Sequence, residues 1–238
     1  MPQRAAIIAV SQAAFQSEGD GRTTDSRARE PVSIDNPFRR ATYLLSAHHL
    51  RQLPPDTGIE VAIAGRSNAG KSSAINVLTE QKSLARTSKT PGRTQQIVVF
   101  GLDEERRITD LPGYGYAKVP AQLKEHWQRV MQAYFESRKC LRGVVLVMDI
   151  RHPMKPFDAT MIDWCQASGL PCHVLLTKAD KLKRGPARAA LLAVRKALPS
   201  LASAQVFSAR SRAGLEELVE TLSRWFRYGS HPGLAAVD

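Results

Sequence analysis

Long apolar runs are missing from this sequence of 238 residues. The longest, Val144 to Met148, falls far short of the roughly 18 residues that cross a bilayer, and we interpret it as a buried strand. Ala5 to Val10 is too short, and too soon followed by polar residues, for a secretory signal. An organelle-targeting peptide is the alternative, because several arginines occur nearby: Arg4, Arg22, Arg27 and Arg29.

Cysteine is also scarce. The three cysteines are Cys140, Cys165 and Cys172, and no two of them have CxxC spacing. An odd number without close pairs argues against a disulfide framework and against a zinc site. We therefore expect reduced, mostly buried thiols, as in a cytosolic protein.

Acidic residues are fewer than basic ones, 22 against 34, which leaves a formal net charge of +12 and a pI near 10.0. Such a balance favours polyanionic partners, either nucleic acid or anionic lipid. The plain alternative is a protein that is merely soluble and basic. Many of the basic residues crowd the C-terminal third: Lys181, Lys183, Arg184, Arg188, Arg195, Lys196, Arg210, Arg212, Arg224 and Arg227.

Composition and periodicity divide the chain into three parts, and the sequence shows no internal repeat. Residues 1–35 are polar and predict a disordered arm, 36–228 predict one folded domain, and 229–238 a flexible tail. Apolar runs alternate with helix-period segments in the domain, which is typical of an α/β fold. The predicted strands are Ile59–Ala64, Gln96–Gly101, Arg106–Asp110, Val144–Asp149, His173–Thr177 and Ala204–Phe207. The predicted helices are Lys71–Thr79, Ala121–Cys140, Pro156–Ser168, Pro186–Leu198 and Gly214–Phe226, with a short helix or strand near Ala41–His49.

A short polar turn separates the second and third of these strands, which predicts a hairpin and hence one antiparallel edge strand. The fold class we predict is therefore α/β, a three-layer α/β/α arrangement around a mostly parallel sheet of six strands.

One motif between a predicted strand and a predicted helix has the spacing of a phosphate-binding loop, G-x-x-x-x-G-K-[ST]. It comprises Gly65, Arg66, Ser67, Asn68, Ala69, Gly70, Lys71 and Ser72. The glycines let backbone N–H groups turn toward an anion, and the start of the helix favours negative charge. Lys71 is suited to the β and γ phosphates, and the Ser72 hydroxyl is a hard ligand for Mg²⁺. This P-loop alone does not choose between ATP and GTP.

Three later segments do choose, and they follow in the order that a GTPase needs. Asp110, Leu111, Pro112 and Gly113 end a strand, where Asp110 can reach Mg²⁺ through water and Gly113 a γ-phosphate. Thr177, Lys178, Ala179 and Asp180 follow another strand, where a carboxylate can accept two hydrogen bonds from guanine but none from adenine. Phe207, Ser208 and Ala209 end the last strand, near the guanine oxygen. The polar stretch 83–96 is interpreted as a switch loop, with an ordinary surface loop as the alternative.

Together these segments resemble the translation-factor-like P-loop GTPases, and more narrowly the EngB (YihA/YsxC) family. The narrower resemblance rests on segments 89–95 (KTPGRTQ), 110–117 (DLPGYGYA), 149–153 (DIRHP) and 177–180 (TKAD), and it covers about residues 36–228. It implies the P-loop GTPase fold and a cytoplasmic GTPase that assists assembly of the large ribosomal subunit and is needed for normal division and septation. It assigns the first switch to Gly92, Arg93, Thr94, Gln95 and Gln96, and magnesium to Ser72 and Thr94.

Two positions depart from the wider GTPase pattern. Thr177 stands where most GTPases have asparagine, and EngB-like proteins share this threonine. Tyr114 replaces the glutamine that orients the attacking water elsewhere, and we therefore predict slow intrinsic hydrolysis that depends on Lys71 and Thr94. In some related GTPases an asparagine at the Asn68 position coordinates K⁺ in place of an arginine finger. We hypothesise that Asn68 does so here; the alternative is an asparagine that stabilises its own turn.

The predicted function is a monomeric, GTP-controlled assembly factor whose ligands are GTP, GDP and Mg²⁺. Its basic face would bind a large-subunit precursor through ribosomal RNA phosphates. One alternative is a P-loop nucleotide kinase, which would not need the TKAD segment. Another is a membrane-surface GTPase, although no basic amphipathic helix or lipidation motif supports stable membrane association.

Overall fold

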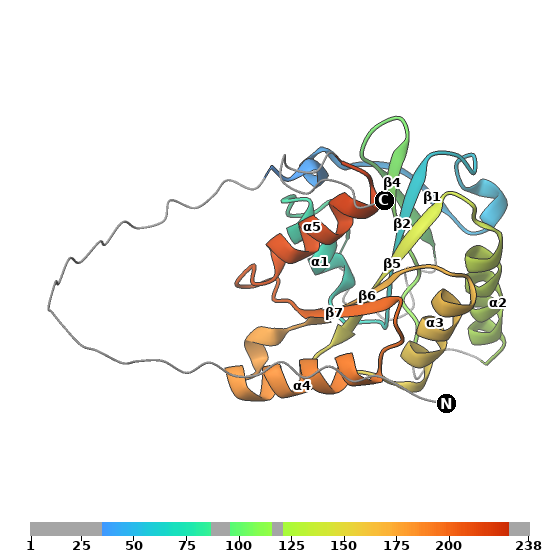
Figure 1. Cartoon of the computed structure of the whole chain (residues 1–238). Helices are drawn as coiled ribbons and strands as arrows, with labels where there is room; N and C mark the ends of the chain where they lie inside the picture. The colour runs from blue at the N-terminus through green and yellow to red at the C-terminus, as the bar shows by residue number, and fades with distance from the viewer. Residues whose placement is uncertain (1–34, 87–95, 116–120, 229–238) are drawn as a thin grey trace, which may run out of the picture. The chain divides into compact units, whose positions relative to one another are not determined.

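The computed structural model describes residues 35–86, 96–115 and 121–228, so residues 1–34 and 229–238 of the predicted arm and tail lie outside it. Strands and helices alternate along the described chain (Figure 1). The strands are β1 (Thr42–Ala47), β2 (Ile59–Gly65), β3 (Ile97–Gly101), β4 (Arg106–Asp110), β5 (Leu141–Asp149), β6 (Cys172–Thr177) and β7 (Ala202–Val206). The helices are α1 (Lys71–Leu78), α2 (Ala121–Ser137), α3 (Pro156–Ala167), α4 (Arg184–Ala197) and α5 (Leu215–Trp225). Short 3-10 turns form η1 (Pro37–Arg40), η2 (Leu50–Gln52) and η3 (Ala179–Lys181).

All described strands form one seven-stranded sheet in the order β1-β3-β4-β2-β5-β6-β7. Strand β3 runs antiparallel to both of its neighbours, and the pairs from β4 to β7 are parallel. The predicted hairpin is therefore present, but two details of the prediction were wrong. The sheet has seven strands rather than six, and the antiparallel strand is not at the edge, because β1 pairs with its outer side.

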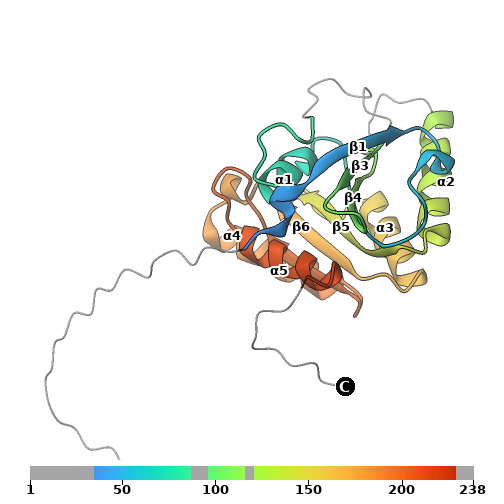
Figure 2. The ribbon, with the colours of Figure 1, turned by 90° about the horizontal axis from the view of Figure 1, so that it is seen from above.

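The sheet is covered by helices on both faces, as the predicted three-layer class requires. Side chains of α2, α3 and α4 join one apolar cluster, and those of α1 and α5 join the other. Figure 1 shows α1 beside α5, and Figure 2 shows α2 and α3 to one side of the strands with α1 to the other. Strand β5 supplies both layers: Val144 and Leu146 belong to the first cluster, Val145 and Val147 to the second. A strand buried on both faces reads as a continuous apolar run, which explains the one at 144–148.

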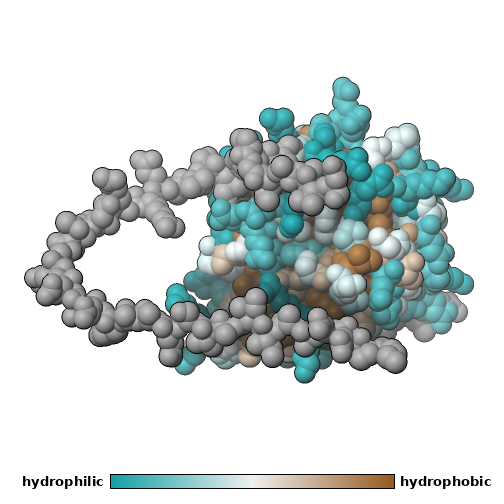
Figure 3. All heavy atoms as spheres, viewed as in Figure 1, coloured by the Kyte–Doolittle hydropathy of each residue, from teal (hydrophilic) through white to brown (hydrophobic). Residues whose placement is uncertain are grey.

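Helix α5 shows how a single stripe of residues places a helix. Its leucines at 215, 218 and 222 are buried at a spacing of three and four residues, the period of one helix face. The surface seen over α5 in Figure 3 is mainly hydrophilic, as expected for the opposite side of such a helix.

The three cysteines are free and buried, which confirms their expected place in the interior. Burial raises the pKa of Cys140 to about 12, so its thiol stays protonated at neutral pH. Within the described ranges, no helix combines the length and apolar character needed to cross a membrane.

A buried polar cluster holds the C-terminal end of α2 against the sheet. Glu60, the second residue of β2, is fully buried. Its carboxylate accepts hydrogen bonds from Arg107 (3.0 Å), from Arg138 (2.8 Å) and from the Tyr134 hydroxyl. Two arginines and one phenol thus satisfy a charge that would otherwise be costly to bury. The sequence showed no sign of this cluster, because its members are far apart along the chain.

Candidate functional site

The predicted P-loop links β2 to α1 at the carboxyl edge of the parallel strands, where α/β proteins bind ligands. Two of its residues have left-handed backbones, Asn68 (φ 61°) and Gly70 (φ 102°). Asparagine and glycine tolerate this conformation best, so the tight path of the loop follows from its sequence. A Cβ atom at Gly65 would lie 2.6 Å from the Val147 carbonyl oxygen, so no residue larger than glycine fits at that position.

A cavity of about 260 Å³ lies directly over this loop. Its walls come from four parts of the predicted site and from two positions to which sequence analysis gave no role, Ser73 and Arg86. The predicted residues in the wall are Arg66, Ser67, Asn68, Gly70, Lys71, Ser72, Gln96, Asp110, Leu111, Pro112, Gly113 and Lys178. The structure therefore brings the P-loop, the end of the first switch, the second switch and Lys178 of the base segment around one cavity. Gly92, Arg93, Thr94 and Gln95 lie outside the described residues.

Lys71 and Asp110 form an ion pair across the floor of this cavity. Burial raises the pKa of Asp110, although the neighbouring Lys71 ammonium acts in the opposite direction. Each charge thus neutralises the other. A phosphate entering the cavity would compete with Asp110 for Lys71, and the released carboxylate would favour a cation.

The oxygen donors around the cavity fit Mg²⁺. The Ser72 hydroxyl and the Asp110 carboxylate both line it, and hard oxygen ligands are what Mg²⁺ prefers. The other predicted ligand, Thr94, is outside the described residues.

The second switch begins in close contact with the P-loop. A Cβ atom at Gly113 would lie 3.3 Å from the Ser67 Cα atom. The Ser67 N–H group donates to the Tyr114 carbonyl oxygen at 2.8 Å, and Arg66 pairs with Tyr114 in a short parallel bridge. The two phosphate-facing segments are therefore joined by backbone hydrogen bonds.

The side chain of Tyr114 turns away from the cavity. Its hydroxyl donates to the buried Asp158 carboxylate on α3 at 2.7 Å, and its ring packs 4.6 Å from that of Phe157. Burial raises the pKa of the Tyr114 phenol. Tyr114 therefore ties the second switch to α3, and its hydroxyl is held where it cannot orient a water over the phosphates.

The two predicted guanine segments meet at the ends of β6 and β7. The Ala179 N–H group donates to the Phe207 carbonyl oxygen at 3.1 Å. The Ser208 hydroxyl donates to one carboxylate oxygen of Asp180 at 2.7 Å, which lowers the pKa of Asp180 and keeps it ionised. The other oxygen of Asp180 remains for a ligand, with a weak contact to Lys181 at 3.7 Å.

The base segment is also tied to the P-loop, through two contacts that the sequence did not reveal. The Thr177 hydroxyl donates to the Ala69 carbonyl oxygen, so the threonine replaces the missing asparagine amide as a link between the segments. The Lys178 ammonium donates to the Asn68 carbonyl oxygen at 2.6 Å and to Asp149 at 2.9 Å. These contacts fix the position of the base segment relative to the P-loop.

Asp149 is a site residue to which sequence analysis gave no role, although it opens the DIRHP segment. It accepts hydrogen bonds from Lys178 and, at 2.7 and 2.9 Å, from Arg151. Hydrogen bonds from Arg151 lead the effects that lower the pKa of Asp149. Its position at the end of β5, beside β6, was the available signal, because carboxyl ends of neighbouring parallel strands meet.

Comparison with known protein families assigns the chain that carries this site to a family. Residues 60–178, half of the chain, match the family described as "50S ribosome-binding GTPase". The chain belongs to this family. It is accordingly a GTP-hydrolysing enzyme, and the nucleotide-kinase alternative is set aside.

Solved structures similar to this GTPase share its fold. A probable GTP-binding protein EngB superposes with a TM-score of 0.59 at 23% identity, over 71% of this chain and all of the other. Era from Aquifex aeolicus, bound to GDP and aluminium fluoride, gives 0.58 at 24% identity, over 73% of this chain and 58% of the other. Era with MgGDPNP and a segment of 16S ribosomal RNA gives 0.55 at 26% identity, over 74% and 59%. The GTPase thus spans the whole EngB chain but little more than half of Era.

Proposed function

We propose that this GTPase is an EngB-like switch that assists assembly of the large ribosomal subunit in the cytoplasm. GTP would order both switches, the ordered protein would bind a ribosomal precursor, and hydrolysis would release it. The role in normal cell division and septation, which the family resemblance implies, is part of this proposal. The family match supports the ribosomal part, since it is described by binding to the 50S subunit.

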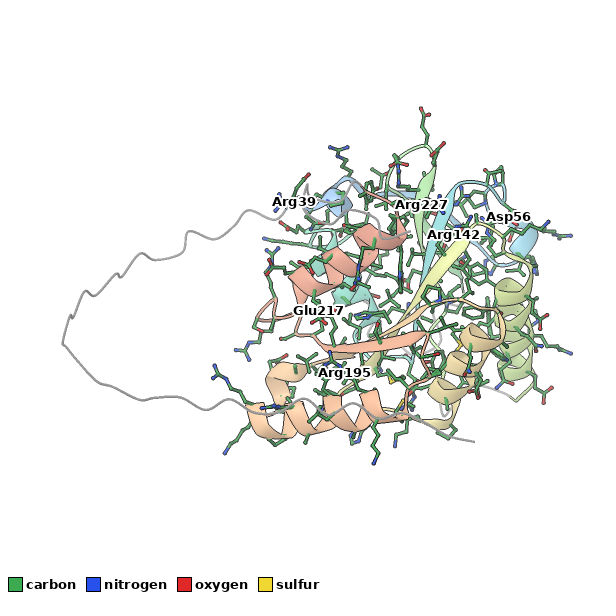
Figure 4. All side chains as sticks on the ribbon, in the orientation of Figure 1. Arg39, Asp56, Arg142, Arg195, Glu217 and Arg227 are labelled. Atoms are coloured by element: carbon green, nitrogen blue, oxygen red, sulfur yellow. The ribbon has the colours of Figure 1, made fainter. Side chains whose placement is uncertain are left out.

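The observation that carries the RNA-binding part is the exposed basic surface of α4, which begins four residues after the base segment ends. Arg184, Arg188 and Lys196 are all exposed on this helix. Arg195 is partly engaged: it donates to the Ala204 carbonyl oxygen at 2.7 Å, and Figure 4 shows it beside β7. Exposed guanidinium and ammonium groups on one helix suit a row of phosphates.

Ser72 and the first-switch Thr94 would hold Mg²⁺, and Asp110 would reach it through water. When bound, Mg²⁺ supplies positive charge where the transferred phosphoryl group becomes more negative. Lys71, which also lines the cavity, would bind and orient the phosphates.

For Asn68 we propose a ligand role toward K⁺, alongside a structural one. Its left-handed backbone shows that it shapes the turn. The K⁺ role predicts that GTP hydrolysis is faster in K⁺ than in Na⁺ buffer, and that Asn68→Ala removes the difference. Equal rates in the two salts would leave Asn68 only as a turn residue.

The experiment that tests the proposed function compares two charge-reversal variants in the same assays. Arg184→Glu with Arg188→Glu changes α4, and Lys139→Glu with Arg142→Glu makes the same charge change at the start of β5. All four side chains are exposed, and the second pair lies at the end of the sheet away from the site loops. Each variant is pelleted with large ribosomal subunits and floated with vesicles that contain phosphatidylserine.

We expect the α4 variant to lose most of its ribosome binding and the β5 variant to keep it, with little flotation of either. If both variants pellet like the wild type, α4 is not the RNA-binding surface. If the wild type floats with the vesicles and does not pellet with ribosomes, the membrane-surface alternative is correct.

A further inference from the structure

Arg86 lies in the polar stretch 83–96 that was interpreted as a switch loop, but sequence analysis gave it no role of its own; in the structure it lines the phosphate cavity together with Lys71 and Ser72. We propose that Arg86 binds the phosphates of the bound nucleotide, as a second cation in addition to Lys71. The inference rests on the proposed use of this cavity for the nucleotide. It adds a phosphate-binding residue that is neither in the P-loop nor among the residues assigned to the two switches, 92–96 and 110–113.

The backbone just before Arg86 is clamped onto α1. The Asn76 carboxamide accepts a hydrogen bond from the Ala85 N–H group at 2.7 Å and donates to the Ala85 carbonyl oxygen at 2.9 Å. Ala85 is only 3% exposed and belongs to the apolar cluster under α1. A two-point clamp on a buried residue fixes both the position and the direction of the chain as it reaches Arg86.

The clamp and the phosphate ligands belong to the same short helix. Lys71 and Ser72 begin α1, and Asn76 lies little more than one turn further along. The distance from the Arg86 backbone to the P-loop is therefore set by one rigid element rather than by a long connection. Such positioning is what a preorganised binding group needs, because little conformational freedom remains to be lost when the ligand binds.

The charge balance around a bound nucleotide favours another cation in the cavity. When a phosphate displaces Asp110 from Lys71, the carboxylate offsets part of the charge of Mg²⁺, so Lys71 and one Mg²⁺ leave part of the negative charge of a nucleoside triphosphate uncompensated. Arg66 also lines the cavity, but its guanidinium lies against Gly115 of the second switch, within 2.9 Å of where a Cβ atom would be. Arg86 is exposed, and a guanidinium can bind phosphate oxygens in pairs.

The test measures dissociation constants of Mg-GTP and Mg-GDP at equilibrium for several variants of the full chain. Arg86→Gln should raise the GTP dissociation constant by about tenfold, the size expected from losing one charge-assisted hydrogen bond. Arg86→Lys keeps the charge and should recover part of the loss. Lys82→Gln is the matched control, since Lys82 is an exposed cation of the same loop that does not line the cavity.

If Arg86→Gln binds GTP as tightly as Lys82→Gln, the inference is overturned. Lys71→Ala separates this failure from that of the site itself. Loss of GTP binding in Lys71→Ala, with none in Arg86→Gln, would reject only the role of Arg86. Unchanged binding in Lys71→Ala would reject the cavity as the nucleotide site.

Asn76 is a positioning residue in this account, and a double-mutant cycle tests it. Asn76→Ala alone should weaken GTP binding, and it should weaken it much less when Arg86 is already glutamine. Equal effects of Asn76→Ala in both backgrounds would mean that Asn76 acts on the fold and not through Arg86.

Discussion

The carboxylate of Asp180 is the group on which base selection depends in this site. One of its oxygens is occupied by the Ser208 hydroxyl, and the lowered pKa keeps the group ionised at neutral pH. A guanine base offers two adjacent N–H donors to such a carboxylate, whereas adenine would leave it without partners.

Asp180→Asn should therefore weaken GTP binding by about two orders of magnitude, because the charge is lost and the amide NH₂ group turns a donor toward a guanine donor, which leaves one neutral acceptor. The same variant should gain affinity for xanthosine triphosphate, whose base carries an oxygen where guanine has an amine. Competition binding with the two nucleotides measures both effects. An Asp180→Asn protein that still prefers GTP would contradict the assignment of the base site.

Tyr114 occupies the position at which many GTPases use a glutamine for water, but its contacts are structural. Tyr114→Phe leaves the buried Asp158 carboxylate without one donor and should lower the free energy of unfolding by about 1–3 kcal/mol. GTP hydrolysis by the folded variant should be unchanged. Urea unfolding and single-turnover hydrolysis measure the two effects.

Tyr43→Phe is the control for this prediction, because the hydrogen bond that the structure gives for the Tyr43 hydroxyl is to Ser46 at an exposed site. Its stability should stay within about 0.5 kcal/mol of the wild type. A marked loss of hydrolysis in Tyr114→Phe without loss of stability would show that the phenol takes part in the reaction.

At the scale of elements, α5 is seated on β5 by the ring of Trp225 over Gly143. A Cβ atom at Gly143 would lie 2.6 Å from the Trp225 ring, closer than packed atoms approach. Gly143→Ala should therefore lower the free energy of unfolding by about 1–3 kcal/mol, as overpacking does. Gly185→Ala in α4 meets nothing within 4 Å and should be neutral or stabilising by up to about 1 kcal/mol. Urea denaturation measures the free energy of unfolding of both variants. Equal values for Gly143→Ala and Gly185→Ala would refute the close packing of Trp225 on Gly143.

Most elements could be predicted because each has a clear periodicity and a clear end. Helix α3 begins at Pro156, as predicted, since proline suits the first turn of a helix. The sequence predicts a short helix or strand at the position of β1 without deciding between them, and in the structure the first three residues of this strand are all exposed. The segment is a strand because it pairs with β3. This pairing joins segments some 50 residues apart, and a local sequence pattern does not contain it.

The site divides in the same way. The P-loop, DLPG and TKAD segments are local spacings tied to known chemistry, so they could be found in the sequence. The contacts of Thr177 with Ala69 and of Tyr114 with Asp158 join distant segments, and no local spacing encodes them. Arg86 was missed for a related reason, since its place depends on the Asn76 clamp.

For the whole molecule, the proposal joins two features that lie close along the chain. The base segment ends at Asp180, and the basic helix α4 begins at Arg184. A partner bound to α4 would therefore lie near the loops that hold the nucleotide, so the nucleotide could control binding without a long-range change of the fold.

The most direct test of this account is co-sedimentation of the protein with purified large ribosomal subunits in two nucleotide states. We predict that the protein pellets with the subunits in the presence of a non-hydrolysable GTP analogue. It should remain largely in the supernatant with GDP, and added salt should weaken the bound state. Equal pelleting in the two nucleotides, or none in either, would contradict a GTP-controlled ribosomal switch.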